Sequence, residues 1–475
     1  MDNVVTSVVD NGLCIGCGMC AGICPQGRLE MRFNERGEYN PVELKDSVPC
    51  PEKCSLCYQV CPAHGDTKNE TDIGCELYSD VDGIQYRTET GYYLSSYLGY
   101  SNSNGHRENG ASGGMATWTL ETLLVTGEVD AVACVGRTYD SDRLFEFRIC
   151  TTTDDIRQCS RSAYYPVEIS HIIQHIMENE GRYAIIGLPC VCKAIRLAQD
   201  KIPKLKDRIK YVLGITCGHT CSKYFAEYLS ALGGGDPHSL HDIVFRIKAP
   251  NEPASNYGMH FRSGTGKAER IGVIRGCDGF GYAFTSGFFP IRGCFFCDDV
   301  FAECADGAFM DAWLPKYAVQ PEGHSIVILR NTMVKAIISS QIGKTLNLSE
   351  IDVRTTILSQ KNTIFLKRRK NYVHYRDALK RGLPTPKMRE SLMRPIHNPI
   401  CCAIERTVYR LANSTGDTWK RVNKNIELFD SEIKQYTHRL KWYRYAAVIL
   451  SPSVFRAVLR KIMKFAARLP KETRE

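Results

Sequence analysis

The fold of this chain is decided first by residues 14–25, CIGCGMCAGICP, and residues 50–62, CPEKCSLCYQVCP. Each stretch holds four cysteines at short intervals and ends in Cys-Pro; the second has one more residue between its first two cysteines. A [4Fe–4S] cluster needs four converging thiolates, and a C-x2-C-x2-C loop can wrap three of them around it. The sequence therefore predicts two such clusters and a role in moving electrons.

The ligands can be assigned by one rule: in two-cluster ferredoxins the last cysteine of each run binds the other cluster. One cluster then takes Cys14, Cys17, Cys20 and Cys61, and the other takes Cys50, Cys54, Cys57 and Cys24. Structural zinc is the alternative, because paired C-x2-C motifs also form zinc ribbons. Two triple runs, each closed by Cys-Pro, favour the clusters. Residues 1–70 are predicted to form a ferredoxin-type βαββαβ domain whose folding depends on its metal.

Composition sets the outer limits for the rest of the chain. Its 475 residues suffice for about three domains at roughly 150 residues each. The predicted divisions are 1–70, 71–350 and 351–475. Residues 1–10 have no basic start and no long apolar run, and no later stretch is apolar enough for a membrane span. Because clusters also need reduced thiols, we expect a cytoplasmic protein.

The middle division has an α/β pattern, with a helix predicted at 115–125 and strands at 131–135, 183–187, 211–215, 244–248 and 326–329. Two of these strands are followed closely by a cysteine, Cys190 and Cys217. Open α/β sheets place ligands at the carboxyl ends of their strands. A further C-x2-C, Cys294 and Cys297, could complete a cluster with them. The alternative is a set of buried core thiols.

An ordered series of motifs accompanies these cysteines: ASGG at 111–114, GLPC at 187–190, TCG at 216–218, FRIK at 245–248, CFFCD at 294–298, ADG at 305–307 and DAW at 311–313. Over about residues 1–335 the chain resembles the family of coenzyme F420 hydrogenase/dehydrogenase beta subunits, here fused to a ferredoxin domain. The resemblance implies a ferredoxin-like α+β domain, then an α/β core that binds FAD and a [4Fe–4S] cluster. A basic helical extension, outside the resemblance, would follow.

The same resemblance implies roles for particular residues. Cys190, Cys217, Cys294 and Cys297 become ligands of the core cluster. Ser112, Gly113 and Gly114 become a flavin-contacting turn at a helix N-terminus, where backbone N–H groups suit a pyrophosphate. Tyr164, Arg246 and Lys248 are the remaining predicted contacts of the flavin or of an acidic substrate; coenzyme F420 is one possible substrate.

The chain also departs from the family pattern. Where the family has Ser-Lys-Tyr, this chain has Ser162-Ala163-Tyr164, so the cation expected at the middle position is missing. The usual Gly-Trp after the Arg-x-Lys element is absent, and the nearest aromatic residue is Tyr257. Both changes concern the substrate side of the site, while the cysteines remain.

The C-terminal segment carries a different charge balance. Residues 361–475 hold 27 Lys and Arg against 9 Asp and Glu. Residues 440–468 form a basic amphipathic pattern that could lie on a membrane surface or pack on protein, and packing is favoured. The segment lacks a helix-turn-helix or stacking-aromatic pattern, so nucleic acid is an unlikely partner.

Three functions follow from these features. The favoured one is an iron-sulfur flavoprotein oxidoreductase, in which a small-molecule two-electron donor or acceptor meets FAD and the clusters exchange electrons with ferredoxin or another redox protein. The alternative is a non-catalytic electron-transfer subunit without flavin. The third, least favoured, is a cluster-based redox sensor that binds nucleic acid. No conventional acid–base dyad is visible.

Overall fold

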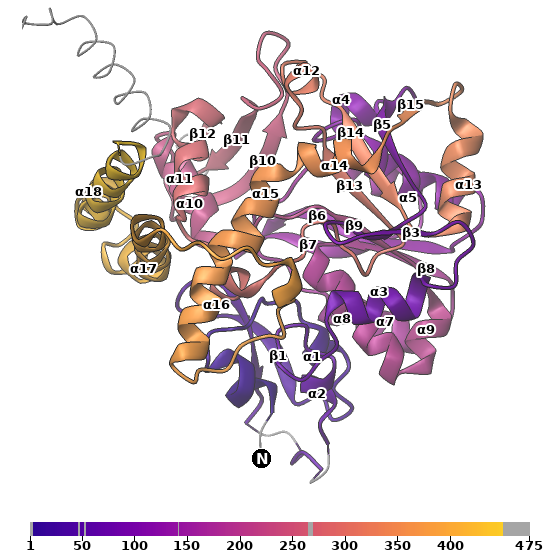
Figure 1. Ribbon diagram of the computed structural model, residues 1–475, viewed down its shortest axis with the longest axis horizontal. Helices are drawn as coiled ribbons and strands as arrows, with labels where there is room; N and C mark the ends of the chain where they lie inside the picture. Colours follow the sequence, from indigo (N-terminus) through magenta and orange to yellow (C-terminus); the bar gives the residue numbers. More distant parts are fainter. Residues whose placement is uncertain (1–2, 46–47, 52–53, 141, 265–268, 450–475) are drawn as a thin grey trace, which may run out of the picture.

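A computed structural model describes residues 3–45, 48–51, 54–140, 142–264 and 269–449. Its centre is an eight-stranded mixed sheet in the order β15-β5-β14-β13-β9-β8-β6-β7 (Figure 1). The four middle strands β13, β9, β8 and β6 are parallel, and antiparallel strands flank them on both sides. The strands are β5 (Ser95–Ser101), β6 (Ala131–Asp140), β7 (Arg143–Cys150), β8 (Tyr183–Gly187), β9 (Ile209–Ile215), β13 (Gly307–Asp311), β14 (Ser325–Leu329) and β15 (Leu346–Glu350).

This sheet confirms the mixed α/β prediction for the middle of the chain. The strands predicted at 131–135, 183–187, 211–215 and 326–329 lie in β6, β8, β9 and β14. The strand predicted at 244–248 overlaps β10 (Leu240–Ile247), which belongs to a separate three-stranded sheet with β11 (Gly258–Ser263) and β12 (Arg270–Arg275).

Helices cover both faces of the large sheet, because successive side chains along a strand point to opposite sides. Ile186 and its neighbours on one face pack against α5 (Met115–Val125), α6 (Thr153–Gln158) and α13 (Thr332–Gln341). Ile185 and its neighbours on the other face pack against α7 (Ser170–Glu178), α8 (Pro189–Lys201) and α9 (Pro203–Arg208). Met19, Ile23 and Val60 join this second core, so the N-terminal cysteine region is attached to the α8 face.

The N-terminal region differs from the predicted βαββαβ unit. Its described residues up to 70 form one hairpin, β1 (Leu29–Phe33) with β2 (Tyr39–Glu43), and the short helices α1 (Met19–Gly22) and α2 (Leu56–Gln59). A short π-helix, η1 (Val5–Val9), stands before the first cysteine loop. Val4 and Val8, one helical turn apart, pack with Leu13 against Cys20 and Cys61. Because residues four positions apart lie on one face of a helix, the helical turn brings the two valines together. In a strand the same two residues would lie farther apart along the chain.

A further hydrophobic core, separate from the two on the faces of the large sheet, joins the small sheet to helices near the end of the described chain. Helices α10 (Lys223–Leu232), α11 (Phe280–Ser286), α17 (Pro399–Arg421) and α18 (Ile426–Ile449) pack there around Phe289, Trp419 and Phe429. Trp419 is fully buried and its indole N–H donates to Glu227 Oε2 at 3.1 Å. This arrangement shows how part of the basic segment is packed against protein.

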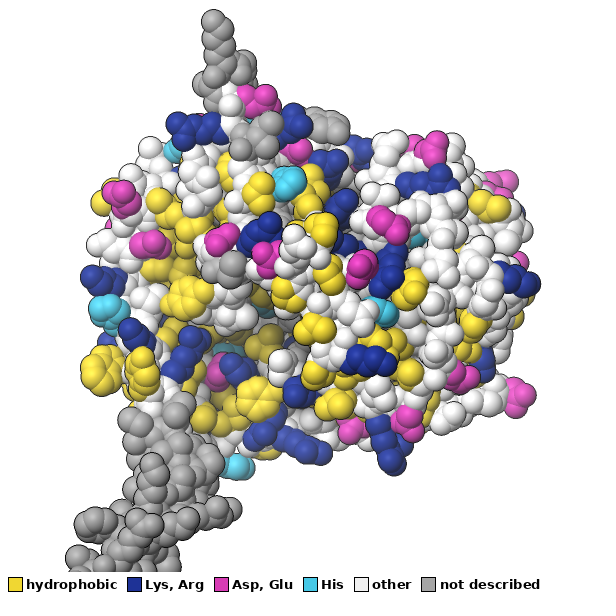
Figure 2. Space-filling view, turned by 90° about the horizontal axis from the view of Figure 1, so that it is seen from above, with side chains coloured by type: hydrophobic (Ala, Val, Ile, Leu, Met, Phe, Trp, Pro, Cys, Tyr) yellow, Lys and Arg dark blue, Asp and Glu magenta, His cyan; other side chains and the backbone are white. Residues whose placement is uncertain are grey.

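The remaining described helices are short. They are α3 (Glu70–Tyr78), α4 (His106–Asn109), η3 (Gly276–Asp278), η4 (Arg292–Phe296), α12 (Pro315–Ala318), α14 (Val353–Ser359), α15 (Lys361–Phe365), η5 (Leu366–Lys370), α16 (Asn371–Lys380) and η6 (Glu390–Leu392), and a small hairpin joins β3 (Gln85–Arg87) to β4 (Gly91–Tyr93). Figure 2 shows cationic side chains interspersed with acidic and hydrophobic ones over the face that it presents.

The amphipathic pattern predicted near the end of the chain can be compared with the structure only in part. Of the amphipathic stretch at 440–468, residues 440–449 belong to α18 and the remainder lies outside the described residues. Among the described helices, none combines the length and the apolar character that a membrane crossing requires.

The domain divisions at 70 and 350 stay predictions, and the contacts described below run across both of them.

Candidate functional site

The first group of N-terminal cysteines is the one predicted to bind a single cluster: Cys14, Cys17, Cys20 and Cys61. Burial raises the pKa of Cys20 well above its ordinary value, and the charges of Cys17, Cys61 and Cys14 raise it further, so the four thiols lie close together. Cys17, Cys20 and Cys61 are buried. The fold thus gathers the predicted four, and their binding of a cluster stays a prediction.

The second group contains Cys24, Cys50, Cys54 and Cys57. Burial raises the pKa of Cys57, and the charges of Cys54 and Cys24 add to the shift. Burial also raises the pKa of Cys50, as does the hydrogen bond that Cys50 donates to Cys54. All four are partly exposed. Because the charge of Cys57 also acts on Cys20, the two groups adjoin.

The core cysteines come from three separate parts of the chain. Cys190 lies in the first turn of α8 just after β8, Cys217 follows β9, and Cys294 and Cys297 lie within and just after η4. Burial raises the pKa of Cys190 well above its ordinary value, and the negative charges of Cys217, Cys297 and Cys294 raise it further. The charge of Cys17 acts on Cys190 as well, so this set adjoins the first N-terminal group.

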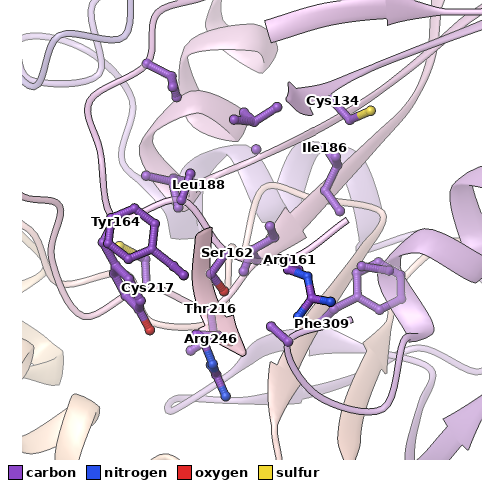
Figure 3. Close-up of a pocket in the computed structure, with 18 of the residues that line it drawn as sticks. Cys134, Arg161, Ser162, Tyr164, Ile186, Leu188, Thr216, Cys217, Arg246 and Phe309 are labelled. Atoms are coloured by element: carbon purple, nitrogen blue, oxygen red, sulfur yellow. The ribbon is translucent and has the colours of Figure 1, made fainter. Parts of the chain in front are cut away.

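A cavity of about 440 Å³ opens beside the core cysteines, at the carboxyl ends of β8 and β9. Cys190, Cys217 and Cys294 line it, and Cys17 of the first N-terminal group lines it too. Its size is typical of a small-molecule or cofactor site, and its position is the one that open α/β sheets use for ligands. In Figure 3, Tyr164 and Cys217 lie on one side of this pocket.

The predicted glycine turn lies at the same cavity. Ser112 and Gly114 line it, directly before α5 begins at Met115. Gly114 has a φ of 76°, and a Cβ there would lie 2.4 Å from the carbonyl oxygen of His106, so only glycine fits. Gly113 is absent from the described cavity lining, and its N–H donates to Ser325 Oγ at 3.0 Å. Gly113 therefore holds the turn against β14.

Arg246 and Tyr164 both line the cavity. Arg246 forms a bidentate ion pair with Asp311, at 2.6 and 2.7 Å, and its guanidinium lies 4.6 Å from the ring of Tyr257. Its φ of 60° is unusual for a long side chain and occurs at an irregularity of β10. Arg246 Nε is buried and has no hydrogen-bond partner among the described residues. The Tyr164 hydroxyl lies 3.3 Å from that of Tyr257.

Lys248 acts on the loop before α5. Its Nζ donates to the backbone carbonyl oxygens of Arg107 and, at 2.6 Å, of Ser112. Burial lowers the pKa of Lys248 to about 7, and the nearby Arg246 and Arg107 lower it further. A neutral amine keeps two N–H groups, which match these two carbonyl oxygens. The structure thus places Lys248 behind the glycine turn, which it holds in position.

Arg161 and His219 also line the cavity, and neither was predicted as a site residue. Arg161 lines the cavity two positions before Ala163, where the family pattern has its cation, and no hydrogen bond or ion pair joins it to another described residue. Its φ of 87° is again strained, and burial lowers its pKa. His219 stacks on Phe284, and its Nε2 is buried without a partner among the described residues. Burial lowers the pKa of His219 to about 4, so it is neutral.

Comparison with models of protein families shows the family to which this chain belongs. Residues 96–174 match the N-terminal model, and residues 180–353 the C-terminal model, of the family described as "Coenzyme F420 hydrogenase/dehydrogenase, beta subunit". The chain belongs to this family. Residues 7–27 match a 4Fe-4S binding domain, which supports iron-sulfur chemistry in the N-terminal region. The predicted family membership is thereby confirmed.

The relatives of this member of the F420 hydrogenase/dehydrogenase family are distant. A coenzyme F420-dependent sulfite reductase of Methanocaldococcus jannaschii is 22% identical over 371 residues, 73% of this chain and 49% of that protein. One subunit of the F420H2 dehydrogenase of Methanosarcina mazei is 21% identical over 217 residues, 45% of this chain and 55% of that protein. The chain thus spans about half the length of both.

One solved structure is also similar, a chain of the F420-reducing [NiFe] hydrogenase complex from Methanosarcina barkeri. The TM-score is 0.47 at 15% identity, and the match covers 62% of this chain and 96% of that one.

Residues after position 353, where the family match ends, form hydrogen bonds with the core cysteines. Lys367 Nζ in η5 donates to Cys297 Sγ at 3.1 Å and to the carbonyl oxygen of Asp299 at 2.6 Å. Asn371 Nδ2 in α16 donates to the carbonyl oxygens of Cys294 and Cys297, at 3.0 and 3.1 Å. The sequence signal was the run of cations at 367–370, which the sequence alone does not distinguish from the rest of the basic extension.

A buried network of ion pairs lies beside these hydrogen bonds. Arg389 contacts Asp298 and Glu303, both at 2.6 Å, and Arg368 contacts Glu303 at 3.0 Å. All four side chains are at most 4% exposed. Arg389 also approaches Glu70 of α3 at 3.7 Å. The network therefore links the N-terminal region, the cysteine loop at 294–303 and the C-terminal segment.

Proposed function

We propose that this chain is an iron-sulfur flavoprotein oxidoreductase that passes electrons between a small two-electron carrier and a redox protein. One observation supports this most strongly: a single cavity is bordered by the glycine turn before α5 and by three of the four core cysteines. A cofactor in that cavity would lie next to the metal centre that the cysteines would form.

The residues around the cavity fit a polar, anionic cofactor such as FAD. Arg246 Nε and His219 Nε2 are buried and unpartnered among the described residues, and Arg161 adds a cation at the same wall. The N-terminus of α5 offers the backbone environment that favours a phosphate group. FAD would supply the exchange between two-electron and one-electron chemistry. In this arrangement Arg161 takes the role of the family's missing lysine.

The three cysteine groups follow one another in space. Cys190 and Cys17 connect the core set to the first N-terminal group, and Cys20 and Cys57 connect that group to the second. The second group is the more exposed of the two N-terminal groups. It is therefore the place where ferredoxin or another redox protein would exchange electrons with this chain.

Coenzyme F420 is the first two-electron carrier to consider, because both distant relatives are named for it. The alternative function, a non-catalytic electron-transfer subunit, is favoured by one fact: the chain spans about half the length of those relatives. A subunit of that kind would need its three cysteine groups and no carrier at the cavity.

The test is an anaerobic reduction of the purified full-length chain, followed by visible absorbance. Reduced F420, NADH and NADPH are offered in turn, and bleaching by one of them is the expected result. Arg161→Gln should weaken binding of the donor or of flavin by roughly 10- to 100-fold, the worth of a hydrogen bond to a charged group. Arg182→Gln, which removes an exposed ion pair with Asp130, is the control. Bleaching by dithionite alone would favour the non-catalytic subunit.

A further inference from the structure

Three other cysteines meet at the cavity, and neither the sequence motifs nor the proposed function uses them. Cys134 lies on β6, Cys150 ends the neighbouring strand β7, and Cys159 directly follows α6. The Sγ atoms of Cys134 and Cys150 are 3.6 Å apart, and those of Cys150 and Cys159 are 3.9 Å apart. All three sulfur atoms lie within 4.8 Å of one another.

These separations suit one small ion. Thiolates that bind zinc tetrahedrally at about 2.3 Å lie about 3.8 Å from each other. The triad distances of 3.6 and 3.9 Å lie on either side of that value. In a [4Fe–4S] cluster each thiolate binds a different iron, so its sulfur atoms are spaced more widely. The three predicted cluster groups do have wider spacing: among the described residues, the triad is the only set of three cysteines as close as 4.8 Å.

We propose that Cys134, Cys150 and Cys159 bind a single zinc ion at the wall of the cavity. Cys134 and Cys159 are cavity-lining residues, so the fourth coordination position faces the cavity and takes a water molecule. In Figure 3 the Cys134 sulfur lies on the opposite side of the pocket from Tyr164 and Cys217. The zinc site is therefore separate from the core cysteine set.

Gly136 of β6 lies next to the triad. A Cβ on Gly136 would lie 2.9 Å from Cys159 Sγ, so glycine at this position gives the sulfur the space it occupies. A side chain at position 136 would therefore displace Cys159 from the other two sulfur atoms.

The zinc would join three neighbouring elements at one point. β6 and β7 pair as adjacent strands, and α6 packs beside them. An ion held by one cysteine from each would fix the turn after α6, which leads directly into Arg161 and the cavity wall. This is a structural role, and it places no reaction step on the ion.

The experiment compares metals in the full-length chain purified anaerobically. Plasma mass spectrometry should find about one zinc per chain in the wild type. Cys159→Ser should lose that zinc and keep its iron and its visible spectrum. Cys75→Ser, which changes an exposed cysteine of α3, is the matched control and should keep both metals. Cobalt(II) added to the zinc-stripped wild type should give the thiolate charge-transfer absorbance of a tetrahedral site, and Cys159→Ser should not.

A second measurement does not depend on a folded variant. Alkylation of the wild type, followed by peptide mass spectrometry, should show the triad protected until a zinc chelator is added. The proposal is overturned if the wild type holds no zinc and takes no cobalt, or if Cys159→Ser keeps its zinc. Iron in place of zinc at the triad, or a Cys134–Cys150 disulfide in the anaerobic protein, overturns it as well.

Discussion

Two sets of cysteines border the same cavity, and they differ in how far apart their sulfur atoms lie. The core set, Cys190, Cys217, Cys294 and Cys297, comes from three parts of the chain, and no three of its sulfurs lie within 4.8 Å. The triad comes from adjacent strands and a helix end and is close enough for one ion. From this difference we expect two kinds of centre, a cluster at the core set and a single ion at the triad.

The largest expected effect separates the two sets by their metals. Cys294→Ser should remove about a third of the iron, four of roughly twelve atoms, because one of three clusters is lost. It should leave the triad's zinc in place, whereas Cys159→Ser should do the opposite. Iron and zinc analysis of both variants checks this. A loss of zinc in Cys294→Ser at unchanged iron would break the distinction.

The next effect concerns the buried ion pairs beside the core set, for which the triad has no described counterpart. Arg389→Met leaves Asp298 and Glu303 buried without their partner, which typically lowers the free energy of unfolding by about 3–5 kcal/mol. Urea unfolding monitored by fluorescence measures it.

The matched control is Arg406→Met, whose pair with Asp377 is partly exposed and should be worth about 0–1 kcal/mol. Equal urea midpoints for the two variants would show that the buried network does not support the cysteine loop.

A smaller effect is expected on the redox potential of the core centre. Lys367→Met removes a cation and an N–H···S contact from Cys297. Reduction adds negative charge to a cluster, so without Lys367 the reduced form is less stable and the potential falls. A redox titration followed by electron paramagnetic resonance should show one centre shifted and two unchanged.

Lys370→Met is the control for that titration, because Lys370 pairs with Glu405 at 3.0 Å and does not contact a cysteine. A shift of all three centres, or an upward shift of the core centre, would show that Lys367 acts otherwise.

The smallest effect is a pH dependence at Lys248, which lies behind the glycine turn and holds its carbonyl oxygens. The pKa of Lys248 is about 7 in the folded chain, lowered by burial, and a free lysine titrates near about 10.4. Between these values the unfolded state holds one more proton, so the contribution of Lys248 to stability rises with pH. The stability of wild type relative to Lys248→Met should therefore increase from pH 7 to pH 9. A difference that falls over this range would show that Lys248 is charged in the fold.

Much of the site could be predicted because short motifs carry it. The spacing of the twelve predicted ligands and the strands before Cys190 and Cys217 depend on neighbours in the sequence. The structure brings these cysteines close together, and their binding of clusters stays a prediction. The triad could not be predicted, since Cys134 and Cys150 approach only through the pairing register of β6 and β7. Arg161 was missed because the family pattern directs attention to position 163. The N-terminal π-helix was missed because the expected ferredoxin unit has a strand there.

The most direct test of the account is the cofactor content of one anaerobic preparation, measured as iron, sulfide, flavin and protein on the same sample. We predict about twelve irons and twelve sulfides with one FAD per chain, because three groups of four cysteines follow one another and the core group borders the cavity proposed for FAD. About eight irons without flavin would contradict it, because the core cysteines and the cavity would then hold neither of the groups proposed for them.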